Sequence, residues 1–113
     1  MAKLEVGRAL TVDRSDGQIH ERARRFASLY GFEVVRDEPR IIELRRGGLL
    51  GELFSFDIQN VPTYLDLELE RPAHGATLVT ARLEARTRFG FFTSGDRVAL
   101  EKQLDVLADT LRG

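Results

Sequence analysis

The chain has 113 residues, of which 42% are hydrophobic and 31% are charged. This length is typical of one domain, and this composition is typical of a soluble globular protein. Seventeen basic and eighteen acidic residues leave a formal net charge of −1, which gives no support for a protein that grips nucleic-acid phosphates. The sequence contains no cysteine, which excludes disulfides, thiolate metal sites and cysteine nucleophiles.

Signals for targeting and for domain division are missing from the sequence. The residues after Met1 form no apolar run, so no secretory signal peptide is expected. No stretch approaches the ~18 consecutive apolar residues that a membrane span requires, so we expect no membrane insertion and a cytoplasmic location. No repeat, low-complexity tract or shift in composition marks a linker, and we therefore expect one α+β domain over residues 1–113.

The first part of the chain predicts a strand followed by a helix. Arg8 occupies a position at which the alternation of the strand predicts an inward apolar residue, so either a bulge turns it outward or it reaches the edge of the core. Ser15 and Gln18 have the spacing of a capping box, and Gly31 suits the left-handed residue that ends many helices. The apolar residues of the strand are Leu4, Val6, Leu10 and Val12, and those at helical spacing are Ile19, Ala23, Phe26, Ala27 and Tyr30.

Several short strands are expected next. Residues 32–36 and 40–46 predict a hairpin whose turn is Asp37-Glu38-Pro39. Residues 47–51 form a glycine-rich loop that lacks the lysine and hydroxyl of a Walker loop, so phosphate binding is not expected there. Phe54, Phe56 and Ile58 then alternate with polar residues, as in a further strand.

The strongest alternation lies between Thr63 and Phe89. Both strands have their aliphatic residues at odd-numbered positions. The numbers of two directly paired residues must therefore add to an even sum, and the turn between the strands must contain an odd number of residues. One allowed register places Asp66 opposite Arg82 on the wet face. The inward residues are Leu65, Leu67 and Leu69 in one strand, and Val79, Ala81, Leu83 and Ala85 in the other.

The last element is a helix with an apolar stripe. Thr93 or Ser94 can cap it, and Asp96 in its first turn suits the positive end of the helix dipole. The resulting order, β-α-β-β-β-β-β-α, predicts an α+β fold with a single, largely antiparallel sheet of five to six strands and two helices on one face. The stripe consists of Leu100, Leu104, Leu107, Ala108 and Leu111.

No catalytic or metal-binding constellation is found. His20 on the first helix and His74 in a Pro/Gly turn have no partner motif, so we interpret both as exposed or rim histidines. No cofactor is expected. An enzyme would have to use arginine, glutamate and tyrosine alone, for example Arg8 and Tyr64, and the sequence gives no reason to expect that geometry.

Some apolar residues are not assigned to a core face by periodicity, and they are the candidates for partner binding. Leu49-Leu50 and Phe91-Phe92 either complete the core or form an exposed contact surface. Val35, Ile41 and Leu53 lie on the outer side of their strands, which carries less charge there than in the last hairpin. The candidate residues for partner binding are Leu49, Leu50, Phe91, Phe92, Ile41 and Leu53.

Two resemblances bear on function. The segment Arg46-Gly47-Gly48-Leu49-Leu50-Gly51-Glu52-Leu53-Phe54-Ser55-Phe56-Asp57 resembles a stretch of uncharacterised small bacterial proteins, which implies no activity. The predicted architecture is similar to helix-grip domains, in which a curved antiparallel sheet wraps a long C-terminal helix around an apolar ligand cavity. That class has two helices after its first strand, whereas one is predicted here.

Two functional hypotheses follow, and an enzyme stands third. The first is a non-catalytic protein-interaction or regulatory domain that self-associates or docks on a protein partner. The alternative is a domain that binds a small apolar ligand between the sheet and the C-terminal helix, in a cavity of about 300 Å³ or more. The lining expected for that cavity includes Phe54, Phe56, Leu67 and Leu104.

Overall fold

A computed structural model describes residues 2–47, 61–71, 75–88 and 90–113. The expected strand at residues 54–58 and the pair Leu49-Leu50 lie outside these ranges. The described elements follow in the order β1 (Ala2–Val12), α1 (Asp16–Tyr30), β2 (Glu33–Glu38), β3 (Ile41–Arg46), β4 (Thr63–Glu70), β5 (Thr77–Thr87) and α3 (Ser94–Arg112).

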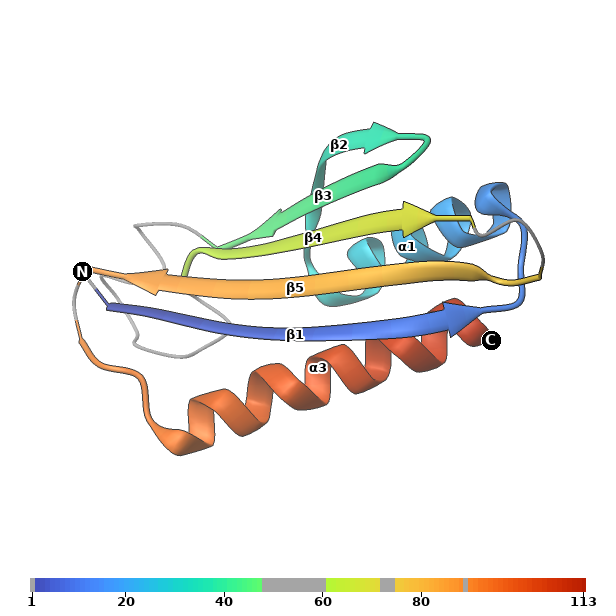
Figure 1. Cartoon of the computed structure of the whole chain (residues 1–113). Coiled ribbons are helices and arrows are strands. Elements are labelled where there is room, and N and C mark those ends of the chain that lie inside the picture. The colour runs from blue at the N-terminus through green and yellow to red at the C-terminus, as the bar shows by residue number, and fades with distance from the viewer. Residues whose placement is uncertain (1, 48–60, 72–74, 89) are drawn as a thin grey trace.

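The strands form one antiparallel sheet in the order β1-β5-β4-β3-β2, and both helices lie against one of its faces (Figure 1). The first strand of the chain pairs with the last, so β1 and β2 are the two edges. This arrangement confirms the expected α+β class, with an antiparallel sheet and two helices.

The β4–β5 ladder has one of the registers that the sequence allowed. Asp66 lies opposite Arg82 and Leu67 lies opposite Ala81, and the inward side chains of both strands are buried. Threonines extend the buried face at the strand ends. Thr63 donates a hydrogen bond to the carbonyl of Val61 at 3.0 Å, so its buried hydroxyl is satisfied.

The edge regions settle one point that the sequence left open, the orientation of Arg8, and correct one prediction, the position of the hairpin turn. The β1–β5 ladder runs without a register shift, so Arg8 keeps its inward parity and its guanidinium pairs with Asp105 of α3 at the edge of the core. Asp37 and Glu38, expected in the turn, instead pair with β3, because an exposed edge strand tolerates acidic side chains while its backbone continues the ladder. The ladder shifts between Val34 and Arg36, which indicates a bulge at Val35.

Both helices begin with a capping box. Ser15 Oγ accepts from the amide of Gln18, whose side chain accepts in return from the amide of Ser15. Helix α1 ends at Gly31, whose φ of 76° lies in the left-handed region, as predicted. For α3 the cap is Thr93, paired with Asp96, whereas Ser94 is already helical.

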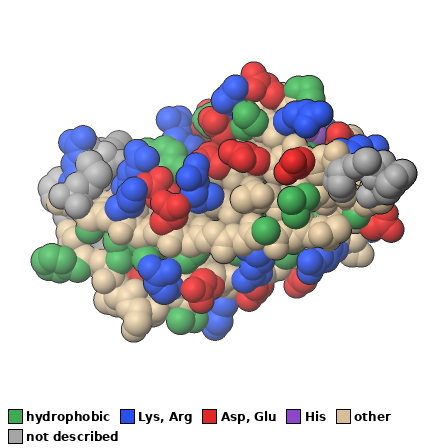
Figure 2. All heavy atoms as spheres, in the orientation of Figure 1, with side chains coloured by type: hydrophobic (Ala, Val, Ile, Leu, Met, Phe, Trp, Pro, Cys, Tyr) green, Lys and Arg blue, Asp and Glu red, His purple; other side chains and the backbone are tan. Residues whose placement is uncertain are grey.

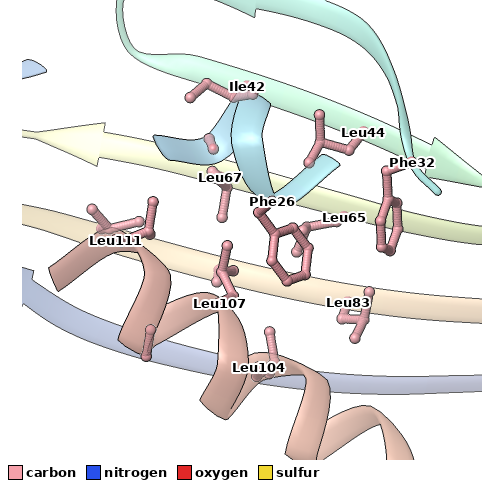
Figure 3. Packing of buried hydrophobic residues seen from close by; sticks show 14 of the residues in the cluster. Phe26, Phe32, Ile42, Leu44, Leu65, Leu67, Leu83, Leu104, Leu107 and Leu111 are labelled. Atoms are coloured by element: carbon pink, nitrogen blue, oxygen red, sulfur yellow. The ribbon is translucent and has the colours of Figure 1, made fainter. Parts of the chain in front are cut away.

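The core lies between the sheet and the two helices (Figure 3). Phe26 of α1 is fully buried among strand residues and stacks against Phe32 at 5.6 Å between ring centroids. The predicted stripe of α3 is buried along its whole length. None of the described helices is long and apolar enough to cross a membrane.

Truncating the stripe of α3 should destabilise the fold strongly. Leu107 is 1% exposed, so Leu107→Ala should remove packing and leave a cavity that costs about 3 kcal/mol of unfolding free energy. Leu29→Ala, at a leucine that is 66% exposed, is the matched control and should cost about 0.5 kcal/mol or less. Urea unfolding followed by circular dichroism measures both, and equal losses would contradict this assignment of the core.

Candidate functional site

Helices α1 and α3 are tied together at one end and separate at the other. Arg14 and Arg22 donate hydrogen bonds to the carbonyls of Arg112 and Thr110, at the C-terminal end of α3. At the other end the two helices leave a hollow of about 220 Å³, which we call the α1–α3 groove. Its described lining consists of Tyr30, Arg46, Ala99, Leu100, Lys102, Gln103 and Val106.

Arg46 lies where three elements meet. It shares the inward parity of Ile42 and Leu44, which are buried, so the last side chain of β3 points toward the helices. Its Nη1 donates to the carbonyl of Tyr30 at 3.3 Å and its Nη2 donates to Oε1 of Gln103 at 2.9 Å. Its Cζ also lies 4.5 Å from the centroid of the Phe32 ring, a cation–π contact. A cation is therefore fixed on the wall of the groove.

Arg46 also lines a second, more open hollow of about 490 Å³ beside β3 and β4. Its guanidinium is thus shared between that hollow and the α1–α3 groove. The other described residues of the second hollow are Gly31, Glu33, Arg45, Gly47, Pro62 and Tyr64.

The groove has a positive and apolar character. Lys102 is exposed, and it makes no ion pair with any residue in the described ranges. Ala99, Leu100 and Val106 supply apolar surface beside it. Within the described lining, two side chains are cationic and none is acidic.

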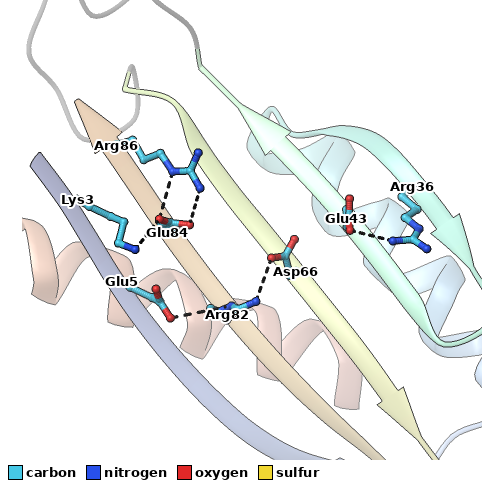
Figure 4. Close-up of polar contacts among 8 residues, drawn as sticks. All are labelled: Lys3, Glu5, Arg36, Glu43, Asp66, Arg82, Glu84 and Arg86. Atoms are coloured by element: carbon cyan, nitrogen blue, oxygen red, sulfur yellow. Dashed lines mark hydrogen bonds and ion pairs between the residues drawn. The ribbon is translucent and has the colours of Figure 1, made fainter. Parts of the chain in front are cut away.

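The opposite face of the sheet is a mixed-charge surface. Figure 4 shows charged side chains of the strands on the side of the sheet away from the helices, and Figure 2 shows acidic and basic side chains interspersed over the face in view. Arg82 lies 3.7 Å from Asp66, as predicted, and Arg86 hydrogen-bonds Glu84 through both Nε and Nη2. This bonding lowers the pKa of Glu84. Burial against the strands raises the pKa of Asp66, with Glu43 adding to the effect and Arg82 opposing it.

A separate polar cluster fixes the β2–β3 hairpin on α1. The side chain of His20 is 12% exposed, with Nδ1 at 2.6 Å from Oδ1 of Asp37 and Nε2 at 3.1 Å from the carbonyl oxygen of Pro39. Arg24 donates to the other oxygen of Asp37 at 2.7 Å. The bonds from His20 and Arg24 lower the pKa of Asp37. Both ring nitrogens of His20 therefore lie against oxygen atoms of the hairpin. Its role here is structural.

The two residues that the sequence offered as an example of a catalytic pair are separated by the sheet. Arg8 and Tyr64 lie on opposite faces of the sheet, since Arg8 has inward parity and Tyr64 packs under Arg86 on the outer face. They cannot form one site. In the described ranges, no group of three or more histidine, aspartate or glutamate side chains could hold a metal ion.

The structure places only some of the sequence-predicted site residues. Phe91 is 85% exposed, Phe92 is half-buried against the core, and Ile41 is half-buried. Leu67 and Leu104, expected to line a cavity, are buried in the core and do not line the groove. Leu49, Leu50, Leu53, Phe54, Phe56 and His74 lie outside the described residues.

Sequence reasoning missed the groove itself. The parity that Arg46 shares with Ile42 and Leu44 was a usable signal for an inward arginine. Tyr30, expected in the buried stripe of α1, is instead 40% exposed, because it lies where α1 and α3 separate. That separation is a tertiary property and leaves no mark on the periodicity of either helix.

The similarity of this chain to known proteins lies in its structure. No family model and no curated protein matches the sequence. The crystal structure of Ara h 8.0201 matches with a TM-score of 0.65 at 8% identity, covering 99% of this chain and 97% of that one. At this identity the likeness shows the fold alone, which is a helix-grip fold. The structure of TTHA0849 from Thermus thermophilus overlaps more loosely, with a TM-score of 0.41 at 14% identity over 96% of this chain and 91% of that one, and supports no argument.

The cluster around Asp37 should make stability depend on pH in the acid range. A carboxylate with a lowered pKa stabilises the fold above its unfolded pKa, and this contribution is lost as the pH falls through the folded pKa. Asp37→Asn should therefore cost about 1 kcal/mol at pH 7 and progressively less below about pH 4. Unfolding free energies across this pH range test it, with Asp13→Asn in the β1–α1 turn as the control. A cost that is equally large at pH 3 would contradict it.

Proposed function

We propose that this protein binds a small apolar molecule in the α1–α3 groove. The observation that carries the proposal is an open hollow of about 220 Å³, lined by the C-terminal end of α1, the last residue of β3 and one side of α3. Small-molecule sites are typically concave, mostly apolar and supplied with a few fixed polar groups. Arg46 and Gln103, which are hydrogen-bonded to each other, are such groups.

The helix-grip architecture supports binding near the C-terminal helix, and the packing favours one side of that helix. The similarity stated from the sequence implies a ligand between the sheet and this helix. In this chain Leu104 and Leu107 are buried in the core beneath α3, whereas Ala99 and Val106 face the hollow beside it. The proposed site is therefore on the α1 side of α3.

The size of the hollow limits the ligand. An apolar cavity of about 150 Å³ accommodates benzene, so a hollow of about 220 Å³ suits one or two fused rings. At about 0.3 kcal/mol per non-hydrogen atom, a two-ring ligand of about 14 such atoms gains about 4 kcal/mol, which corresponds to a dissociation constant of about 1 mM. We expect the physiological ligand to be small and mostly apolar.

A neutral aromatic probe tests the proposal. 1-Naphthaleneacetamide should bind with a change in its own fluorescence, which can be read without tryptophan background because the chain has no tryptophan. Ala99→Phe should weaken binding about tenfold or more, because the added ring occupies the hollow.

The matched control for this experiment is Glu101→Phe, which adds the same ring at an exposed position outside the groove lining. It should leave binding unchanged. The proposal fails if the probe does not bind, or if both phenylalanine variants bind it as well as the parent protein.

A second candidate function, protein interaction, is favoured by a different observation. Four of the six large apolar side chains that are exposed in the described ranges lie between residues 29 and 35: Leu29, Tyr30, Val34 and Val35. They join the end of α1 to β2, an edge strand whose outer side has no described strand partner. Exposed apolar side chains beside an edge strand are typical of association sites. We propose self-association through this surface as the second function.

Self-association predicts a dimer of this 12.8 kDa chain in sedimentation equilibrium at micromolar concentration. Val35→Asp should restore the monomer mass without changing the thermal midpoint, because Val35 is already 49% exposed. Val98→Asp, at a valine that is 48% exposed on α3, is the control and should leave the dimer intact. A monomer at every concentration would exclude this function.

A further inference from the structure

We infer that the α1–α3 groove selects ligands that carry one anionic group on an apolar body. This inference rests on the proposed function, and it adds the chemical class of the ligand. The observation behind it is the pairing of two cations with apolar surface in one hollow.

The first cation, Arg46, is fixed in place before any ligand arrives. Its guanidinium is hydrogen-bonded to the carbonyl of Tyr30 and to Gln103, and it stacks on Phe32. When an anion reaches this guanidinium, the guanidinium can replace its neutral acceptor, the amide oxygen of Gln103, with a charged one. Charge-assisted hydrogen bonds of arginine are about twice as strong as neutral ones, so the exchange favours an anionic ligand over a neutral one of the same shape.

The second cation, Lys102, is exposed to solvent. It lies one residue before Gln103 on α3 and makes no ion pair within the described part of the chain. Its flexible stem allows the ammonium group to approach an anion from the solvent side, opposite the fixed guanidinium. The apolar part of the ligand then lies against Ala99, Leu100 and Val106.

Charge complementarity also argues against the other ligand types. A cationic ligand would meet two positive side chains and no described acid in the groove lining. A long lipid chain would exceed the available volume of about 220 Å³. The remaining class is a small aromatic or short aliphatic carboxylic acid, or another organic anion of that size.

A matched pair of probes tests this inference separately from the proposed function. 1-Naphthaleneacetate and 1-naphthaleneacetamide share one apolar body and differ in charge. Isothermal titration calorimetry with the full chain should give a dissociation constant about tenfold lower for the acetate. Binding of both probes with equal affinity would overturn the inference while leaving the proposed function intact, whereas binding of neither would overturn both.

Variants then assign the preference to the two cations. Lys102→Met and Arg46→Met should each reduce the ratio of the acetate affinity to the acetamide affinity about threefold or more. Lys3→Met, at the other lysine of the chain on the outer face, should leave the preference unchanged. Since Arg46 also holds the two helices together, Lys102→Met is decisive if Arg46→Met does not fold. An unchanged preference in Lys102→Met would then contradict the inference.

Discussion

The pairing of β4 with β5 puts the aliphatic side chains of both strands on one face of the sheet and their ionic side chains on the other. A sheet of this kind is stable only when its apolar face is covered, and the described elements that cover it are α1 and α3. Helix α1 is shorter than the long strand β5. The eleven residues of β5 span about 36 Å, whereas the fifteen residues of α1 span about 22 Å. Arg22 holds α1 against the C-terminal end of α3, so α1 ends before it reaches the first half of that helix. The α1–α3 groove follows from this difference in length.

The same kind of hydrogen bond caps the C-terminal ends of both helices. Carbonyl groups in the last turn of a helix lack partners within it and carry the negative end of its dipole, so they attract cations. Arg14 and Arg22 bind such carbonyls of α3, and Arg46 binds one at the end of α1. Placing a guanidinium on the inward side of a sheet costs solvation, and these bonds together with the Phe32 ring offset that cost. Arg46 therefore has a structural role that is independent of any ligand, and this role also holds its charge at the groove.

Local patterns predicted the parts of the fold that depend on neighbouring residues in the sequence. The alternation from Leu65 to Ala85 limited the last hairpin to registers in which paired residue numbers have an even sum, because a shift by one residue would expose the whole apolar set. The observed Asp66–Arg82 pair belongs to one of these registers. The spacing of Ser15 and Gln18 located the start of α1 for a similarly local reason. The groove was not predictable in this way. It depends on where α1 ends relative to α3, which no residue pattern within either helix records, and for this reason Tyr30 was expected to be buried. Only the parity of Arg46 carried a local trace of the site.

Both candidate functions draw on the C-terminal end of α1, but they make different demands on it. A protein partner needs exposed apolar surface, and this is supplied near β2 by Leu29, Tyr30, Val34 and Val35. A small ligand needs concavity and fixed polar groups, and these occur on the side of α3, where Arg46 and Gln103 are already oriented by each other. Tyr30 is the one residue common to both surfaces. A ligand in the groove would cover its ring from one side and so change the surface that a second copy meets, which couples the two equilibria whenever both occur. Because this coupling is reciprocal, a dimer formed through β2 would alter ligand affinity by the same factor as the ligand alters dimerisation.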